Sequence, residues 1–225
     1  MLKRKAPERP ESEGDAKFVI LFFLFLLSFH HKDLIFFFRT QKTQGFNDKA
    51  TAKNVRGALK GEVGEFEETA KVPDNARYIC GNAQDLLDRA IEMRNVGAVR
   101  LLLGKFNASP DAMSRRYWER PLMRFLACVT PISNNPNELE PFIEILELLF
   151  YHGADPNKDP LPGVPLFHLA VSTKSSEIVE QFLSAGADRF SKDYAGRSAL
   201  DLARSMNNQA AIELLENWSD DPILE

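Results

Sequence analysis

The chain has 225 residues, with 28 basic and 32 acidic side chains and a formal net charge of −4 at pH 7. Its hydrophobic content of 44% and charged content of 27% are ordinary for a soluble globular protein, and the near-neutral balance argues against a dedicated nucleic-acid binder. The two cysteines, Cys80 and Cys128, are too few for a disulfide framework and have no Cys or His neighbours at metal-ligand spacing. We therefore expect reduced thiols in a reducing compartment.

Residues 1–17 are strongly polar. They carry five basic and four acidic side chains, two prolines and almost nothing apolar. Such a segment cannot bury enough surface to offset the entropy of ordering, so a disordered polar tail is predicted here.

Residues 18–38 form a hydrophobic run that contains eight of the 17 Phe residues. Its continuous apolar part, residues 18–29, would make a helix of about 18 Å, against a hydrocarbon core of about 30 Å. The whole run is long enough to span a bilayer, but Lys32 and Asp33 then lie inside it, at a cost of about 2.5–3.5 kcal/mol each near the centre. A cleavable signal peptide fits poorly, because the preceding leader is long and mixed in charge. Three interpretations stay open: a membrane anchor, a translated T-rich non-coding stretch or unstructured insertion, and some other local use.

Residues 39–82 turn polar again. Lys, Thr, Gln, Glu and Gly recur, and the apolar residues, among them Val55, Leu59 and Phe66, are scattered. This composition predicts a polar linker with at most a transient helix, so the folded domain is expected to cover residues 83–225.

A period of 33 residues appears in the last third of the chain. It separates Gly153 from Gly186 and Gly163 from Gly196. Between these glycines, apolar residues recur at helical spacing, and the same register places Val179 and Leu200 in a core. A fixed period of this size is typical of a solenoid of stacked two-helix units.

The repeated segments resemble the ankyrin repeat, whose units have the approximate form G-x-T-P-L-H-x-A followed by E-I-V-x-x-L-L-x-x-G-A-D. Residues 163–170 are GVPLFHLA and residues 177–188 are EIVEQFLSAGAD; residues 196–203 are GRSALDLA and residues 211–215 are AIELL. The resemblance weakens towards the N-terminus, where two degenerate units complete a set of four from about residue 83 to residue 218. The second unit has about 12 extra residues between its helices, predicted as a surface loop around residues 130–137.

The resemblance implies an all-α fold: an ankyrin-type helix-turn-helix solenoid with short β-hairpin or loop tips, preceded by a largely disordered N-terminal region. It also implies structural roles for three titratable residues. His168 bridges backbone groups of neighbouring units, while Asp155 and Asp188 stabilise turns. The sequence contains no Walker-type loop, no H-E-x-x-H and no G-x-S-x-G. We therefore expect no enzymatic activity, no cofactor, no metal and no small-molecule substrate.

Ankyrin-like stacks bind proteins through their tips and inner helices, so the resemblance implies a non-catalytic interaction module, an adaptor, scaffold or inhibitor in the cytosol or nucleus. Two tips contain residue types that dominate interface hot spots, and their basic groups favour an acidic or mixed-charge protein partner over nucleic acid. Trp118 or Tyr117 could equally fill a gap in the degenerate second unit. The alternative function is a membrane-tethered ankyrin-repeat protein, anchored through residues 18–38. The candidate protein-binding residues are Arg115, Arg116, Tyr117, Trp118, Lys192, Tyr194 and Arg197.

Overall fold

The computed structural model describes residues 49–61, 64–116, 118–130, 136–160 and 162–218, all of which belong to one compact unit, Asn47–Glu225. In these ranges the regular structure is helical, without β-strands, and an isolated antiparallel bridge joins Lys192 to Ser198. The helices are α3 (Lys49–Ala58), α4 (Glu65–Lys71), α5 (Pro73–Glu92), α6 (Val96–Gly104), α7 (Pro121–Val129), α8 (Pro136–Tyr151), α9 (Leu166–Ser172), α10 (Ser176–Ser184), α11 (Ala199–Ser205) and α12 (Gln209–Asn217).

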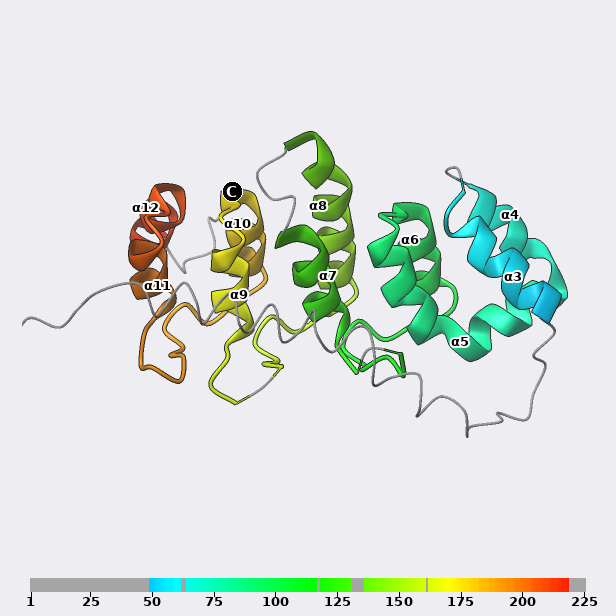
Figure 1. Cartoon of the computed structure of the whole chain (residues 1–225), viewed down its shortest axis with the longest axis horizontal. Helices are drawn as coiled ribbons and strands as arrows, with labels where there is room; N and C mark the ends of the chain where they lie inside the picture. The colour runs from blue at the N-terminus through cyan, green and yellow to red at the C-terminus, as the bar shows by residue number, and fades with distance from the viewer. Residues whose placement is uncertain (1–48, 62–63, 117, 131–135, 161, 219–225) are drawn as a thin grey trace, which may run out of the picture. The chain divides into compact units, whose positions relative to one another are not determined.

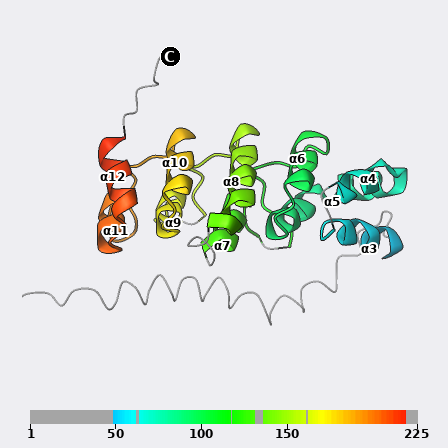
Figure 2. The same ribbon diagram turned by 90° about the horizontal axis from the view of Figure 1, so that it is seen from above.

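The helices pack as successive pairs that stand side by side in a row (Figure 1). The pairs are α3/α4, α5/α6, α7/α8, α9/α10 and α11/α12. Viewed from above, the pairs from α7/α8 to α11/α12 make two layers (Figure 2). One layer follows the contacts from α5 through α7 and α9 to α11, and the other runs from α6 through α8 and α10 to α12. Each inner pair is thus covered by the pairs on either side of it, and the pairs at the two ends are covered on one side.

The helices of the last two pairs repeat at the predicted period. Helix α11 begins 33 residues after α9, and α12 begins 33 residues after α10. The predicted loop in the α7/α8 pair is only partly correct, because α8 has 16 residues where α10 and α12 have nine each. Much of the extra length therefore extends a helix, and residues 131–135 lie outside the described residues.

Local capping explains why the helices end at the same positions in each pair. Gly153 and Gly186 have φ angles of 87° and 85°, a conformation that is free of strain only for glycine. At the start of the second helices, Ser175 accepts a hydrogen bond from the Ile178 amide, and Asn208 accepts one from Ala211 in the next pair. These side chains satisfy backbone donors that have no partner within the helix.

Aromatic side chains connect neighbouring pairs in the core. The Phe182 ring is fully buried and lies 5.2 Å from Phe150 of the preceding pair and 6.4 Å from Phe167 of its own pair, centroid to centroid. Val179 is fully buried as expected, but Leu200 is only half-buried. Helix α11 packs mainly on α9 and α12, and no further helix pair follows it among the described residues, so one of its sides is left without a covering pair.

The prediction of a polar linker over residues 39–82 is wrong for residues 49–82. Helices α3 and α4 pack against each other and against α5, which begins ten residues before the expected domain start. Val55, Leu59 and Phe66 are buried in this packing. One apolar residue every three or four positions suffices for one buried helical face, so sparse apolar residues do not indicate a linker here. Residues 39–48 lie outside the described residues.

The expectations for residues 1–17 and 18–38 also fall outside the described part of the chain. Among the helices of the described part, none combines the length and the hydrophobicity required to cross a bilayer.

We expect Phe182→Ala to reduce the free energy of unfolding by about 3–5 kcal/mol, because it removes a buried ring at the contact of two helix pairs and leaves a cavity. Urea denaturation followed by circular dichroism measures the change. Phe190→Ala is the matched control: this ring is 70% exposed, so its removal should cost less than about 0.5 kcal/mol. Equal effects of the two substitutions would contradict the packing described above.

Candidate functional site

Three loops connect the last four helix pairs: residues 105–120, 152–165 and 185–198, called here the first, second and third tip loops. All three emerge at the same end of the helices, at the lower side of Figure 1. They contain all seven residues that the sequence analysis singled out.

Helix α5 holds the first tip loop through side-chain hydrogen bonds. The Gln84 amide nitrogen donates to the carbonyls of Ser109 and Ala112, both at 3.0 Å, and its oxygen accepts from the Ser109 amide at 3.1 Å. Asp85 accepts from the Arg115 amide at 2.9 Å. The loop backbone is therefore anchored on both sides of its bend.

Further hydrogen bonds join each tip loop to the next. A carboxylate oxygen of Asp111, in the first loop, accepts from the Asp155 amide in the second at 3.1 Å. Asn157, in the second loop, donates to the Gly186 carbonyl and accepts from the Asp188 amide of the third, at 2.9 and 2.8 Å. The three loops thus form one continuous hydrogen-bonded ridge.

The turn-closing roles expected for Asp155 and Asp188 are confirmed, whereas the bridge expected for His168 is formed on one side only, because its buried Nδ1 has no hydrogen-bond partner among the described residues. Asp155 accepts from the Asn157 amide at 2.8 Å, and Asp188 accepts from the Phe190 amide at 2.9 Å, so each carboxylate closes a turn. His168 is buried, and its Nε2 lies 2.9 Å from the Arg197 carbonyl in the loop that leads to the next pair.

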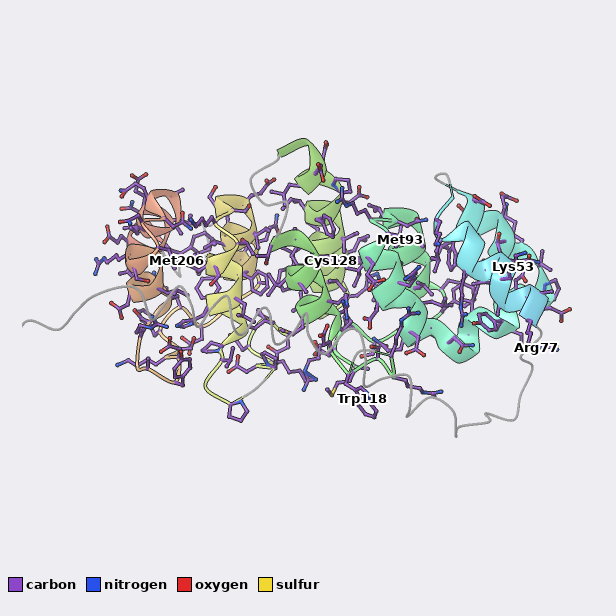
Figure 3. All side chains as sticks on the ribbon, viewed as in Figure 1. Lys53, Arg77, Met93, Trp118, Cys128 and Met206 are labelled. Carbon is purple, nitrogen blue, oxygen red and sulfur yellow. The ribbon has the colours of Figure 1, made fainter. Side chains whose placement is uncertain are left out.

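The first tip loop exposes its candidate residues. Trp118 is 65% exposed and has a φ angle of 54°, and Figure 3 shows it beyond the ends of the helices. It does not fill a gap in the core. Arg115 and Arg116 are also exposed, whereas Tyr117 lies outside the described residues.

The candidate residues of the third tip loop differ in their exposure to solvent. Lys192 is exposed and Tyr194 is 61% exposed, but Arg197 is half-buried and its Nε lies 2.9 Å from an Asp193 carboxylate oxygen. Burial acts to raise the pKa of Asp193, yet hydrogen bonds from the Arg197 amide and guanidinium prevail and hold that pKa below its ordinary value. Arg197 therefore braces the loop and is less available to a partner than Lys192 and Tyr194.

Two further exposed apolar residues stand on the tip loops beside the seven candidates. Met113 is half-exposed, and Phe190 is the more exposed of the two. The Arg189 guanidinium lies 4.7 Å from the Phe190 ring centroid and donates to the Trp218 carbonyl at 2.8 Å. The position of both residues in turn-rich loops, where apolar side chains have no core to enter, is the sequence signal that indicates them.

Sequence reasoning also missed a buried cluster of charges at the base of the first tip loop. Asp88 in α5 is fully buried, and Arg124 in α7 is 4% exposed. The Arg124 guanidinium lies 2.9 Å from a carboxylate oxygen of Glu119 and 3.6 Å from one of Glu92. Burial raises the pKa of Asp88 to about 7, although the Ser114 hydroxyl and Arg124 act to lower it. Charged residues that follow apolar ones within a helical apolar pattern, as in Leu-Leu-Asp and Met-Arg-Phe, are the sequence signal for this cluster.

The cluster connects three parts of the chain and is closed to solvent. It joins α5, the first tip loop and α7, so it fixes the loop on which Trp118 stands. A carboxyl with a raised pKa is typical of an active site when a substrate can reach it. Asp88 has no exposed surface. We therefore interpret it as part of the structural support of the loop.

The described residues offer little else for chemistry. They contain no group of three or more His, Cys, Asp or Glu that could hold a metal ion. A groove of about 920 Å³ lies between the α3–α4 turn, the α5/α6 pair and α8. Two arginines that line the groove, Arg94 and Arg100, form ion pairs with carboxylates of α8 at 3.1 and 2.7 Å.

Burial raises the pKa of the Cys128 thiol to about 11, which disfavours the reactive thiolate.

Comparison with known proteins found no family model that matches the sequence, and no match among curated proteins.

Replacement of Asp88 by Asn tests the buried cluster through its pH dependence. With a raised pKa, the folded state retains, between about pH 4 and 7, a proton that the unfolded chain releases, so the free energy of unfolding falls as the pH rises across this window. Asn cannot ionise. We expect Asp88→Asn to stabilise the protein by about 2–3 kcal/mol more at pH 8 than at pH 5, measured by urea denaturation at both values.

Asp74→Asn, an exposed substitution of the same kind in the same helix, is the control for the change of side chain. If Asp88→Asn changes the stability by the same amount at both pH values, the carboxyl titrates as it does in the unfolded chain and the proposed burial effect is wrong.

Proposed function

We propose that this chain is an ankyrin-type repeat protein that binds a protein partner without catalysis, through the ridge formed by its tip loops. The ankyrin assignment is supported by the sequence motif together with the 33-residue spacing of the helix starts in the last two pairs. The contact of His168 with the following loop also agrees with the role that the resemblance implies.

The observation that carries the binding proposal is the position of the exposed apolar side chains. Four of them, Met113, Trp118, Phe190 and Tyr194, stand on the first and third tip loops. Exposed aromatic residues are typical anchors of protein interfaces. The hydrogen-bonded ridge holds the loop backbone in place, so binding requires little additional ordering.

The charges on the same loops favour an acidic or mixed-charge partner. Arg115 and Lys192 are exposed on the first and third loops, next to the aromatic residues. Opposite charge on the partner would accelerate association and set its orientation, while the buried aromatic contacts would contribute most of the affinity. An adaptor or inhibitor that presents one rigid surface to another protein fits this combination.

Combined replacement Trp118→Ala and Phe190→Ala is expected to weaken partner binding by about 30-fold or more, because each ring is large enough to act as a hot spot. The partner is first identified by affinity capture, as a protein retained by the unmodified chain and not by the support without it. Isothermal titration calorimetry with the purified pair then measures the change in Kd.

Tyr151→Ala is the matched control, because this aromatic side chain is 85% exposed but lies at the end of α8 and not on the ridge. It should leave both the Kd and the melting temperature unchanged. A double variant that binds normally while its melting temperature falls would assign the rings to packing and contradict the proposal.

A further inference from the structure

Helix α3 carries a line of cations on one side. Lys49, Lys53, Arg56 and Lys60 are spaced by four, three and four residues. At about 100° per residue the three cations on α3, Lys49, Lys53 and Arg56, fall within an arc of about 60° and extend over roughly 10 Å along the axis, while Lys60 lies in the turn after the helix ends at Ala58. We call these four residues the α3 stripe.

The other side of the same helix is apolar and buried. Ala52, Val55 and Ala58 pack into the unit, while all four cations of the α3 stripe are exposed. Lys53 is labelled on α3 in Figure 3, in the helix pair at one end of the row. The stripe is therefore displayed on the outer face of an amphipathic helix that the fold holds rigidly.

No carboxylate neutralises the α3 stripe within the part of the chain that the structure describes. Helix α3 contains no acidic residue, and none of the four cations forms an ion pair with a described residue. Elsewhere in the unit, cations such as Arg94, Arg100 and Arg204 pair with carboxylates at 2.7–3.1 Å. The contrast marks α3 as a place where positive charge accumulates.

The sequence before the stripe continues the same charge pattern, whereas the acidic residues Glu62, Glu65, Glu67 and Glu68 follow it. Residues 39–61 contain six basic residues and a single acidic one, Asp48. The stripe begins 11 residues after the end of the apolar run at residues 18–38.

We propose that the α3 stripe docks onto the surface of an anionic membrane. Basic residues on one side of an amphipathic helix, close in sequence to an apolar segment, are the arrangement that attracts anionic lipid headgroups. Three of the four cations are lysines, which act as point charges suited to a diffuse layer of headgroups. Nucleic-acid recognition would favour arginine forks and stacking aromatic residues, and the stripe offers one arginine and no aromatic residue.

The inference does not depend on the proposed function, because the stripe and the tip loops are different surfaces. Membrane docking uses α3, whereas partner binding uses Trp118 and Phe190 on the tip loops. Each can fail while the other holds.

The test is co-sedimentation of the full-length chain with lipid vesicles. One set contains phosphatidylcholine alone and the other contains about one third phosphatidylserine. Binding to phosphatidylcholine reports any insertion of residues 18–38, and the additional binding caused by phosphatidylserine reports the electrostatic contact. We expect the serine lipid to increase the partition coefficient at least about tenfold at low salt, with the gain lost as salt screens it.

A variant without the four cations of the α3 stripe should lose most of the increase in vesicle binding that phosphatidylserine causes, since each surface cation contributes about fivefold. It carries Lys49→Gln, Lys53→Gln, Arg56→Gln and Lys60→Gln. Its binding to phosphatidylcholine should stay unchanged, as should its melting temperature. The matched control is Arg115→Gln, Lys105→Gln, Lys174→Gln, Lys192→Gln, which removes equal charge from exposed positions on other elements and should retain the gain.

Four results would overturn the proposal. The first is equal binding of the unmodified chain to both vesicle sets, and the second is a gain that survives in the stripe variant. The third is an equal loss in stripe and control variants, which would show an effect of net charge alone. The fourth comes from a competition experiment with a duplex oligonucleotide. If the oligonucleotide displaces the chain from vesicles and binds only through the stripe, α3 is a nucleic-acid site and the membrane proposal is wrong.

Discussion

The fold depends on apolar contact between one helix pair and the next. A single pair has two sides to cover and can bury only the seam between its own helices. The contact of Phe182 with both Phe150 and Phe167 shows how the seam within a pair and the contact between pairs share one ring. The same requirement explains why α3 and α4 are helical: they cover the free side of α5 and α6. At the other end α11 has no following pair among the described residues, and Leu200 is accordingly only half-buried.

Packing brings the helices together, but polar side chains determine where the tip loops stand. Gln84 and Asp85 hold the first loop from below, and Asp111 and Asn157 join each loop to the next. The charged groups of Asp88, Arg124 and Glu119 lie beneath the first loop in a place closed to solvent. Charges in such a place are tolerated only when their partners are fixed, so they favour one loop conformation over others. A rigid loop is what allows an exposed ring such as Trp118 to serve as an anchor.

The exposed surface has two regions of different chemistry. The ridge of tip loops combines aromatic rings with cations, which suits a protein partner with its own apolar pockets and acidic groups. Helix α3 shows cations without aromatic rings, which suits a surface of diffuse negative charge. The two regions lie on different elements, so a protein held at a membrane by one could still present the other.

Local features of the sequence determined much of the helical part. The 33-residue period predicted the spacing between corresponding helices of the last two pairs. Such spacing is visible in the sequence because helix starts and stops depend on residues within one or two turns: Ser175 and Asn208 as caps, Gly153 and Gly186 as stops. The roles of Asp155 and Asp188 were also predictable, since each carboxylate bonds to an amide two residues away. The sequence also indicated two basic and aromatic loops, and the structure exposes Trp118, Lys192 and Tyr194 on them, while their role in binding stays a proposal.

Only the tertiary structure decided the features that depend on residues distant in sequence. The few apolar residues of α3 and α4 are buried because they pack against α5, and the composition of the segment does not reveal that contact. Trp118 is exposed and Arg197 is occupied because of the neighbours that the fold brings to them. Asp88 and Arg124 are 36 positions apart, and their burial in one cluster follows from the packing of α5 against α7. The sequence by itself determined the repeating helices, because caps, turns and apolar periodicity act within a few residues. The side chains that hold the ridge, and the number of helix pairs in the stack, were decided by packing between residues far apart in the sequence, which no local pattern reveals.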